Sequence, residues 1–165
     1  MDTYWTKMTQ MKFHILYLGY HYHRAVRIDR IINIVIAIVS TGSLAGMFVS
    51  PAYQKIWACV IVLMQAVAAT KPYLPFSARV QDLDRGIAAL NVVYENTEKN
   101  WNRIVGEKIP EQEAIALIYN SQTQWDTIDA ELLKKDSLPR NKKYIEMADD
   151  DKNQYFKNMF GGSND

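Results

Sequence analysis

The fold is decided by two apolar runs, Ile31–Val49 (IINIVIAIVSTGSLAGMFV) and Tyr53–Thr70 (YQKIWACVIVLMQAVAAT). The first run contains no charged residue, and the only charge of the second is Lys55, near its start. Because an α-helix rises about 1.5 Å per residue, each run is about as long as the roughly 30 Å hydrocarbon core of a bilayer. Ser50-Pro51-Ala52 between the runs favours a turn. The two runs therefore predict a transmembrane helical hairpin over residues 31–72.

The composition argues against several other classes of protein. The chain has 165 residues, a net charge of +1 and a single cysteine, Cys59, so no intrachain disulfide is expected. Its mean hydropathy of −0.22 is that of a polar chain, because the apolar residues are concentrated between positions 31 and 70. The balanced charge does not favour nucleic-acid binding, and a cleaved signal peptide is not expected. A buried helical hairpin in a water-soluble protein is the alternative to a membrane hairpin.

Basic residues flank the hairpin at its two outer ends. Arg24, Arg27 and Arg30 precede the first run, and Lys71 and Arg79 follow the second. The positive-inside rule then predicts two spans with both termini in the cytoplasm. We expect the three arginines to contact membrane lipids through anionic headgroups, or to contact a phosphate-bearing ligand.

Amphipathic helices are predicted on both sides of the hairpin, because apolar residues recur there at alternating spacings of three and four. Over residues 1–30 this stripe is Tyr4, Met8, Met11, Ile15, Leu18 and Tyr22. Residues 76–135 are expected to form a cytoplasmic helical hairpin. The core of its bundle, or of an oligomer, is predicted to be Val80, Leu83, Ile87, Leu90, Tyr94, Trp101 and Ile104. With a C-terminal helical tail over 139–165, the predicted class is an all-α membrane protein with an antiparallel cytoplasmic bundle.

Few polar residues interrupt the apolar runs: Asn33, Ser40 and Ser43 in the first, and Gln65 in the second. They are predicted either to form hydrogen bonds between helices or to line a narrow aqueous path. Two helices cannot enclose a pore, so such a path requires several copies of the chain. Gly42 and Gly46 form a GxxxG pattern on the opposite face, which favours close helix packing.

No enzyme motif was found in the sequence. GxSxG, P-loop, GxGxxG and HExxH patterns are absent, so no catalytic residue and no cofactor are predicted. His14, His21 and His23 lack nearby carboxylate or thiol support, so no metal site is expected either. A second basic cluster, which includes Lys142 and Lys143, is predicted either to contact nucleotide phosphates or to be a solvated linker.

The layout and the stretch YHYHRAVRIDRI (residues 20–31) resemble the SLATT family, two-transmembrane effectors associated with bacterial nucleotidyltransferases and nucleotide sensors. The resemblance covers roughly residues 10–135. It implies a homo-oligomer, most simply a tetramer, that forms a channel in the bacterial inner membrane. In that family a nucleotide or oligonucleotide signal controls permeabilisation, and infected cells arrest or die before phage release. The signal comes from a nearby nucleotidyltransferase in Hailong-type antiphage systems.

The resemblance supplies no catalytic or ligand-binding residue. Two other functions remain open at this point. One is a non-conducting membrane anchor or adaptor for a partner enzyme, which needs the hairpin but no pore. The other is a holin-like lysis protein, which the long segment after Thr70 does not favour.

Overall fold

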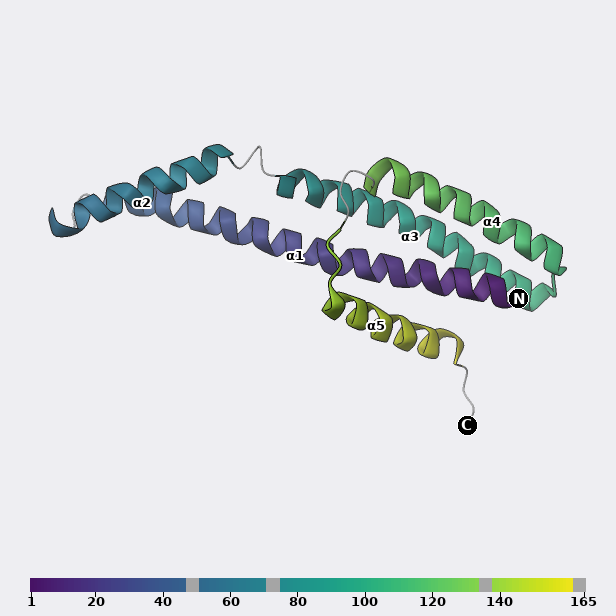
Figure 1. Ribbon diagram of the computed structural model, residues 1–165. Coiled ribbons are helices and arrows are strands. Elements are labelled where there is room, and N and C mark those ends of the chain that lie inside the picture. Colours follow the sequence, from purple (N-terminus) through teal and green to yellow (C-terminus); the bar gives the residue numbers. More distant parts are fainter. Residues whose placement is uncertain (47–50, 71–74, 134–137, 162–165) are drawn as a thin grey trace. The chain divides into compact units, whose positions relative to one another are not determined.

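The computed structural model describes residues 1–46, 51–70, 75–133 and 138–161. In chain order these form α1 (Asp2–Gly46), α2 (Pro51–Thr70), α3 (Pro75–Glu107), α4 (Glu111–Ile128), the π-helical turn η2 (Asp129–Leu133) and α5 (Lys142–Phe160) (Figure 1). No strand occurs within these four ranges. The predicted all-α class is therefore confirmed.

The chain divides into two compact units. One comprises Met1–His23 with Gln81–Asp165, and the other comprises Arg24–Val80. α1 contributes residues to both, since it continues as one helix past residue 30, where the sequence suggested a boundary. Neither glycine nor proline occurs between residues 20 and 40, so nothing in the local sequence interrupts the helix.

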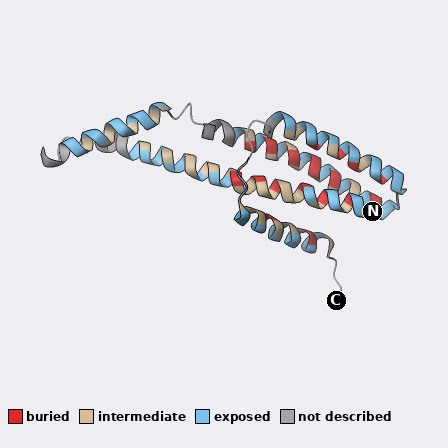
Figure 2. Cartoon of the chain, viewed as in Figure 1, coloured by how far each residue is buried: buried red, intermediate tan, exposed pale blue. Residues whose placement is uncertain are grey.

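The first unit has a closed hydrophobic core. Its buried apolar residues are Tyr4, Met8, Met11, Ile15 and Leu18 of α1; Leu83, Leu90, Val93, Tyr94 and Ile104 of α3; Ile109; Ala114, Ile118 and Trp125 of α4; and Ala148 and Phe156 of α5. Figure 2 shows buried residues along α1, α3 and α4. Leu90 and Ile104 are fully buried in one chain, so packing within the chain accounts for the heptad spacing of α3.

The remaining residues of the predicted bundle core are less buried. Ile87 and Trp101 are partly buried against the core, and Val80 is half-buried in the second unit. Thr97 fills a core position and is fully buried. Its hydroxyl donates to the Val93 carbonyl at 2.8 Å, and its own carbonyl accepts from the Tyr4 hydroxyl at 2.8 Å. The polar core residue is thus satisfied by its neighbours.

The second unit exposes much of its apolar surface. Its exposed large side chains are Ile31, Ile34, Val35 and Ile38 of α1 and Ile56, Val62, Leu63 and Val67 of α2. We call the first four the apolar face of α1. The half-buried residues Trp57, Ile61, Met64 and Ala68 recur along α2 at spacings of four and three, as on a helix that packs along one side.

A helix long and apolar enough to cross a membrane is not found among the described residues. The first predicted span ends at Val49 and the hairpin at residue 72, both outside those residues. That the hairpin spans a bilayer stays a prediction.

Candidate functional site

One side of α1 in the second unit changes from basic to apolar within a few turns. Arg24, Arg27 and Arg30, which we call the arginine face, are all exposed. At 100° per residue they lie within an arc of about 120°, whose centre is about 30° from the centre of the apolar face. A single exposed side of the helix therefore carries three guanidinium groups and then four aliphatic side chains.

The one acidic residue of this stretch lies on another side of α1. Asp29 is about 160° around the helix from the centre of the arginine face, and its carboxylate accepts a hydrogen bond from Asn33 Nδ2 at 2.9 Å. Among the described residues, none of the three arginines has an ion-pair partner. Their charge is therefore not neutralised by the part of the chain that the structure describes.

The predicted pore-lining residues are only partly within the described set. Asn33 and Gln65 are both exposed in a single chain. Ser40 and Ser43 belong to α1, as do the predicted packing residues Gly42 and Gly46. The surroundings of these last four lie outside the described residues, so a path shared with Asn33 and Gln65 stays a prediction.

In the first unit, α1 lies between α3 and α5 (Figure 1), and tyrosines of the YHYH segment connect it to both. The Tyr20 hydroxyl donates to the Asp151 carboxylate of α5, and the Tyr20 ring stacks on Tyr144 with centroids 5.8 Å apart. Tyr22 shares a hydrogen bond with Asp84 of α3, which raises the pKa of Tyr22. These side chains hold helices of the first unit together.

A lysine links three helices at the centre of the same unit. Lys12 Nζ of α1 lies 3.7 Å from the ring centroid of Tyr155 in α5 and 4.7 Å from that of Tyr94 in α3. Both phenol groups donate to Glu98, over 2.7 Å from Tyr155 and 3.4 Å from Tyr94. Burial lowers the pKa of Lys12, against the attraction of Glu98 and Glu95, and raises the pKa of Tyr155 to about 12. The result is a cation–π and hydrogen-bond cluster that ties α5 to the core.

Aromatic rings hold the C-terminal end of α5. Trp5 of α1 contacts Phe156 and Phe160 edge-on, with ring centroids 5.0 and 5.4 Å apart. Trp5 also packs against Trp101 of α3 at 5.3 Å. Edge-to-face pairs of this kind add to the free energy gained by apolar burial.

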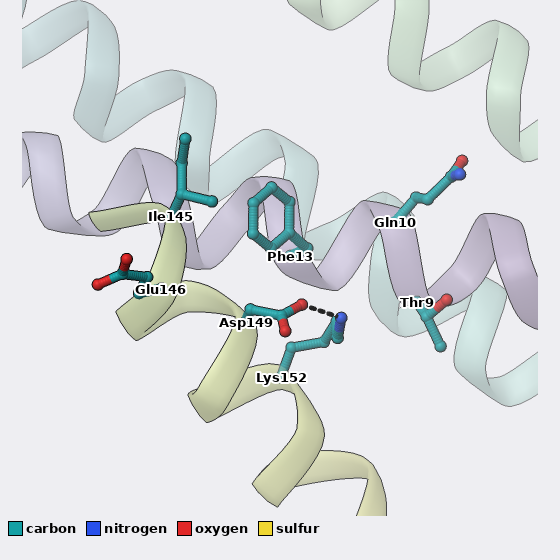
Figure 3. A pocket seen from close by; sticks show the side chains of 7 residues that line it. All are labelled: Thr9, Gln10, Phe13, Ile145, Glu146, Asp149 and Lys152. Atoms are coloured by element: carbon teal, nitrogen blue, oxygen red, sulfur yellow. Dashed lines mark hydrogen bonds and ion pairs between the residues drawn. The ribbon is translucent and has the colours of Figure 1, made fainter. Parts of the chain in front are cut away.

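A groove with a volume of about 410 Å³ lies between α1 and α5. It is lined by Thr9, Gln10 and Phe13 of α1 and by Ile145, Glu146, Asp149 and Lys152 of α5 (Figure 3). The Lys152 ammonium donates to the Asp149 carboxylate, which lowers the pKa of that carboxyl. The lining carries two carboxylates and one ammonium, so the groove does not favour an anionic ligand such as a nucleotide phosphate.

The predicted phosphate contacts of the C-terminal segment lie elsewhere. Lys142 and Lys143 are exposed in the first turn of α5 and do not line the groove. The helix begins after Asn141, whose side chain accepts from the Tyr144 backbone N–H at 3.4 Å. Both lysines are thus in the first turn of a capped helix, within the predicted helical tail.

Two of the three histidines, His14 and His21, pack against aromatic rings of the first unit. His14 lies 3.7 Å from the Asp129 carboxylate, packs edge-on against Trp125, and has a pKa lowered by burial. His21 is buried between the rings of Tyr17 and Tyr144. Within the described ranges, no group of three or more metal-ligating side chains is placed to hold an ion.

The docking of α5 is the feature that the sequence reasoning missed, since residues 139–165 were expected to form a tail. The residues of α5 that are buried or contact α1 include Tyr144, Ala148, Asp151 and Tyr155, again at spacings of four, three and four. Three of these four carry polar atoms, so apolar periodicity alone conceals the stripe. The alternation of aromatic and charged residues was the signal available.

Comparison of the chain with protein-family models, curated proteins and solved structures gives no match. The resemblance to the SLATT family therefore rests on the layout and on the residues quoted for it.

Proposed function

We propose that this chain is the subunit of an oligomeric channel in the bacterial inner membrane. In this proposal it acts as an antiphage effector, and a nucleotide or oligonucleotide signal from a partner nucleotidyltransferase controls its opening. The observation that carries the membrane part is the exposed apolar surface of the second unit. The resemblance to the SLATT family supports the signal, the partner and the role in abortive infection.

The exposed apolar surface of the second unit is unfavourable in water and favours contact with an apolar partner. Four large aliphatic residues of this unit, Ile38, Ile56, Val62 and Leu63, are each more than 60% exposed, and four further ones are 38–53% exposed. Covering eight such side chains at about 1 kcal/mol each is worth on the order of 8 kcal/mol. Contiguous apolar patches of this extent mark contact with lipid or with other proteins. Acyl chains and further hairpins would cover the surface together.

The contacts between copies are proposed to come from the second unit. The heptad residues of α3 from Leu83 to Ile104 pack inside one chain, so they do not call for a second copy. Asn33 and Gln65 remain exposed on the hairpin. Polar side chains on otherwise apolar helices favour contact with other helices or with a water-filled path.

A non-conducting membrane anchor for a partner enzyme is the second candidate. It is favoured by the closed core of the first unit, which needs no second copy to bury its heptad residues. An anchor uses the same exposed hairpin but gives no reason for polar residues within the apolar runs.

Cys59 provides a direct test of membrane insertion, because it is the only cysteine and is exposed in a single chain. A membrane-impermeant maleimide should leave Cys59 unmodified in sealed vesicles of either orientation and modify it after detergent is added. The control variant combines Cys59→Ser with Tyr119→Cys, since Tyr119 on α4 is 66% exposed. That variant should react without detergent when the cytoplasmic side is accessible. Full modification of Cys59 in sealed vesicles would overturn the membrane hairpin.

A second experiment separates the channel from the anchor. Expression of the chain without its regulator, or with the triggering signal, should depolarise the inner membrane and stop growth. A potential-sensitive dye follows the first effect. Cells that keep their membrane potential at high expression, with Cys59 protected, would exclude the channel and leave the anchor.

A further inference from the structure

We propose that the arginine face of α1 binds the phosphates of anionic lipid headgroups, with phosphatidylglycerol as the representative lipid. This inference rests on the proposed function, because it requires the second unit to be in contact with a bilayer.

The arrangement of the three arginines suits a row of phosphates. They follow one another by three residues, so they rise about 9 Å along the helix in total. All three are exposed. Arginine binds phosphate oxygens through paired N–H donors, and its long aliphatic stem allows the charged end to reach the interface.

The apolar face selects a lipid over a free phosphate. It begins at Ile31, the residue after Arg30, and continues on nearly the same side of the helix to Ile38. A nucleotide or an inorganic phosphate would satisfy the guanidinium groups but leave these aliphatic side chains in water. A phospholipid places its phosphate and its acyl chains in this order, so it complements both faces together.

The local electrostatics support the same ligand. Asp29, the only acidic residue among residues 24–38, lies on another side of α1 and accepts from Asn33. Its carboxylate does not neutralise the arginine face. Lys142 and Lys143 make a useful contrast, because they are exposed and basic but are followed by Tyr144, Ile145 and Glu146, of which none is an exposed aliphatic residue.

The experiment is lipid competition on the full chain purified in detergent. Native mass spectrometry measures the ratio of bound phosphatidylglycerol to bound phosphatidylcholine from equimolar mixed micelles. We expect the wild-type chain to prefer the anionic lipid. Replacing Arg24, Arg27 and Arg30 together by Gln should weaken phosphatidylglycerol binding by about 100-fold, as three lost headgroup contacts predict. The control Lys142→Gln/Lys143→Gln should keep the wild-type ratio.

Each other outcome has a defined meaning. An equal ratio in the wild type and the triple variant would overturn the headgroup site, while protection of Cys59 would leave the membrane hairpin standing. Displacement of phosphatidylglycerol by equimolar inorganic phosphate would also overturn it, in favour of a free anion. Binding of neither lipid, with Cys59 reactive in vesicles, would refute the proposed function itself. If the triple variant loses its helical circular dichroism, Arg27→Gln alone should lower the ratio several-fold, and an unchanged ratio counts against the proposal.

Discussion

Removal of the Tyr155 hydroxyl is the most direct test of the cluster that Lys12 forms with Tyr94, Glu98 and Tyr155. This hydroxyl donates to the Glu98 carboxylate at 2.7 Å, and the Tyr155 ring lies under the Lys12 ammonium. Hydrogen bonds to charged groups contribute about 1.5–3 kcal/mol, so Tyr155→Phe should lower the free energy of unfolding by about 2 kcal/mol. Urea unfolding followed by circular dichroism measures this. Tyr119→Phe, at a 66% exposed position, should change it by less than about 0.5 kcal/mol, and equal effects of the two variants would contradict the cluster.

Several tyrosines together predict an alkaline limit to stability. Burial raises the pKa of Tyr4 and of Tyr155 to about 12, and the hydrogen bond to Asp151 raises that of Tyr20 to about 12. A raised pKa favours the protonated phenol in the folded state. This stability is therefore complete below pH 10 and is lost as the pH rises to about 12. The lowered pKa of Lys12 makes stability rise with pH instead, but this is the effect of one group against that of three tyrosines.

The measurement is urea unfolding at intervals between pH 8 and pH 12. The wild-type midpoint should be constant to about pH 10 and then fall. Tyr4→Phe should be less stable at pH 8 but lose less between pH 10 and 12. A wild-type midpoint that stays flat to pH 12 would show that these phenol groups are not held protonated by the fold.

At the scale of elements, α5 is the helix whose attachment is most open to test. It buries Phe156 against Trp5, and its other contacts combine aromatic rings with the hydrogen bonds of Asp151 and Tyr155. Phe156→Ala removes a buried ring at a cost of about 3–5 kcal/mol. We expect Lys142–Phe160 to lose protection in hydrogen exchange while Pro75–Glu107 keeps it, because Phe156 is one of only two buried residues of α5. Met159→Ala, at a 59% exposed position of the same helix, should leave both patterns unchanged. Loss of protection in both helices would mean that α5 is integral to the core.

The helices differ in how far sequence alone could predict them. The stripe Tyr4, Met8, Met11, Ile15 and Leu18 is buried as its spacing predicts, because apolar burial follows the helical period. The attachment of α5 was not predicted, since its contacts depend on distant partners such as Glu98 and Tyr20 rather than on local periodicity. α1 continues past residue 30, as the absence of a helix breaker there allows. The side chains change from basic to apolar after Arg30, while the helical backbone continues unchanged.

At the scale of the whole molecule, the two units differ in how far they bury their apolar residues. The first buries its heptad residues within one chain, so Leu90 and Ile104 are fully covered. The second leaves Ile38, Val62 and Leu63 largely exposed. The first unit buries its own apolar residues, whereas the second leaves apolar residues exposed. Such a chain is suited to attach a folded domain to an apolar surface, such as lipid or another protein, that buries the exposed residues. The same difference is visible in the sequence, because two apolar runs occur in a chain whose mean hydropathy is only −0.22.

The proposed channel predicts that polar residues of the second unit line the conducting path. Asn33→Leu and Gln65→Leu replace exposed polar side chains by apolar ones of similar size. Because hydrophobic constrictions close by losing water, each variant should lower single-channel conductance several-fold in planar bilayers. Asn33→Leu also removes the donor to Asp29, so Gln65→Leu serves as the independent variant. Ile34→Leu, at an exposed apolar position beside Asn33, should conduct like the wild type. Unchanged conductance in both polar variants, with wild-type insertion measured at Cys59, would place the path elsewhere in the assembly.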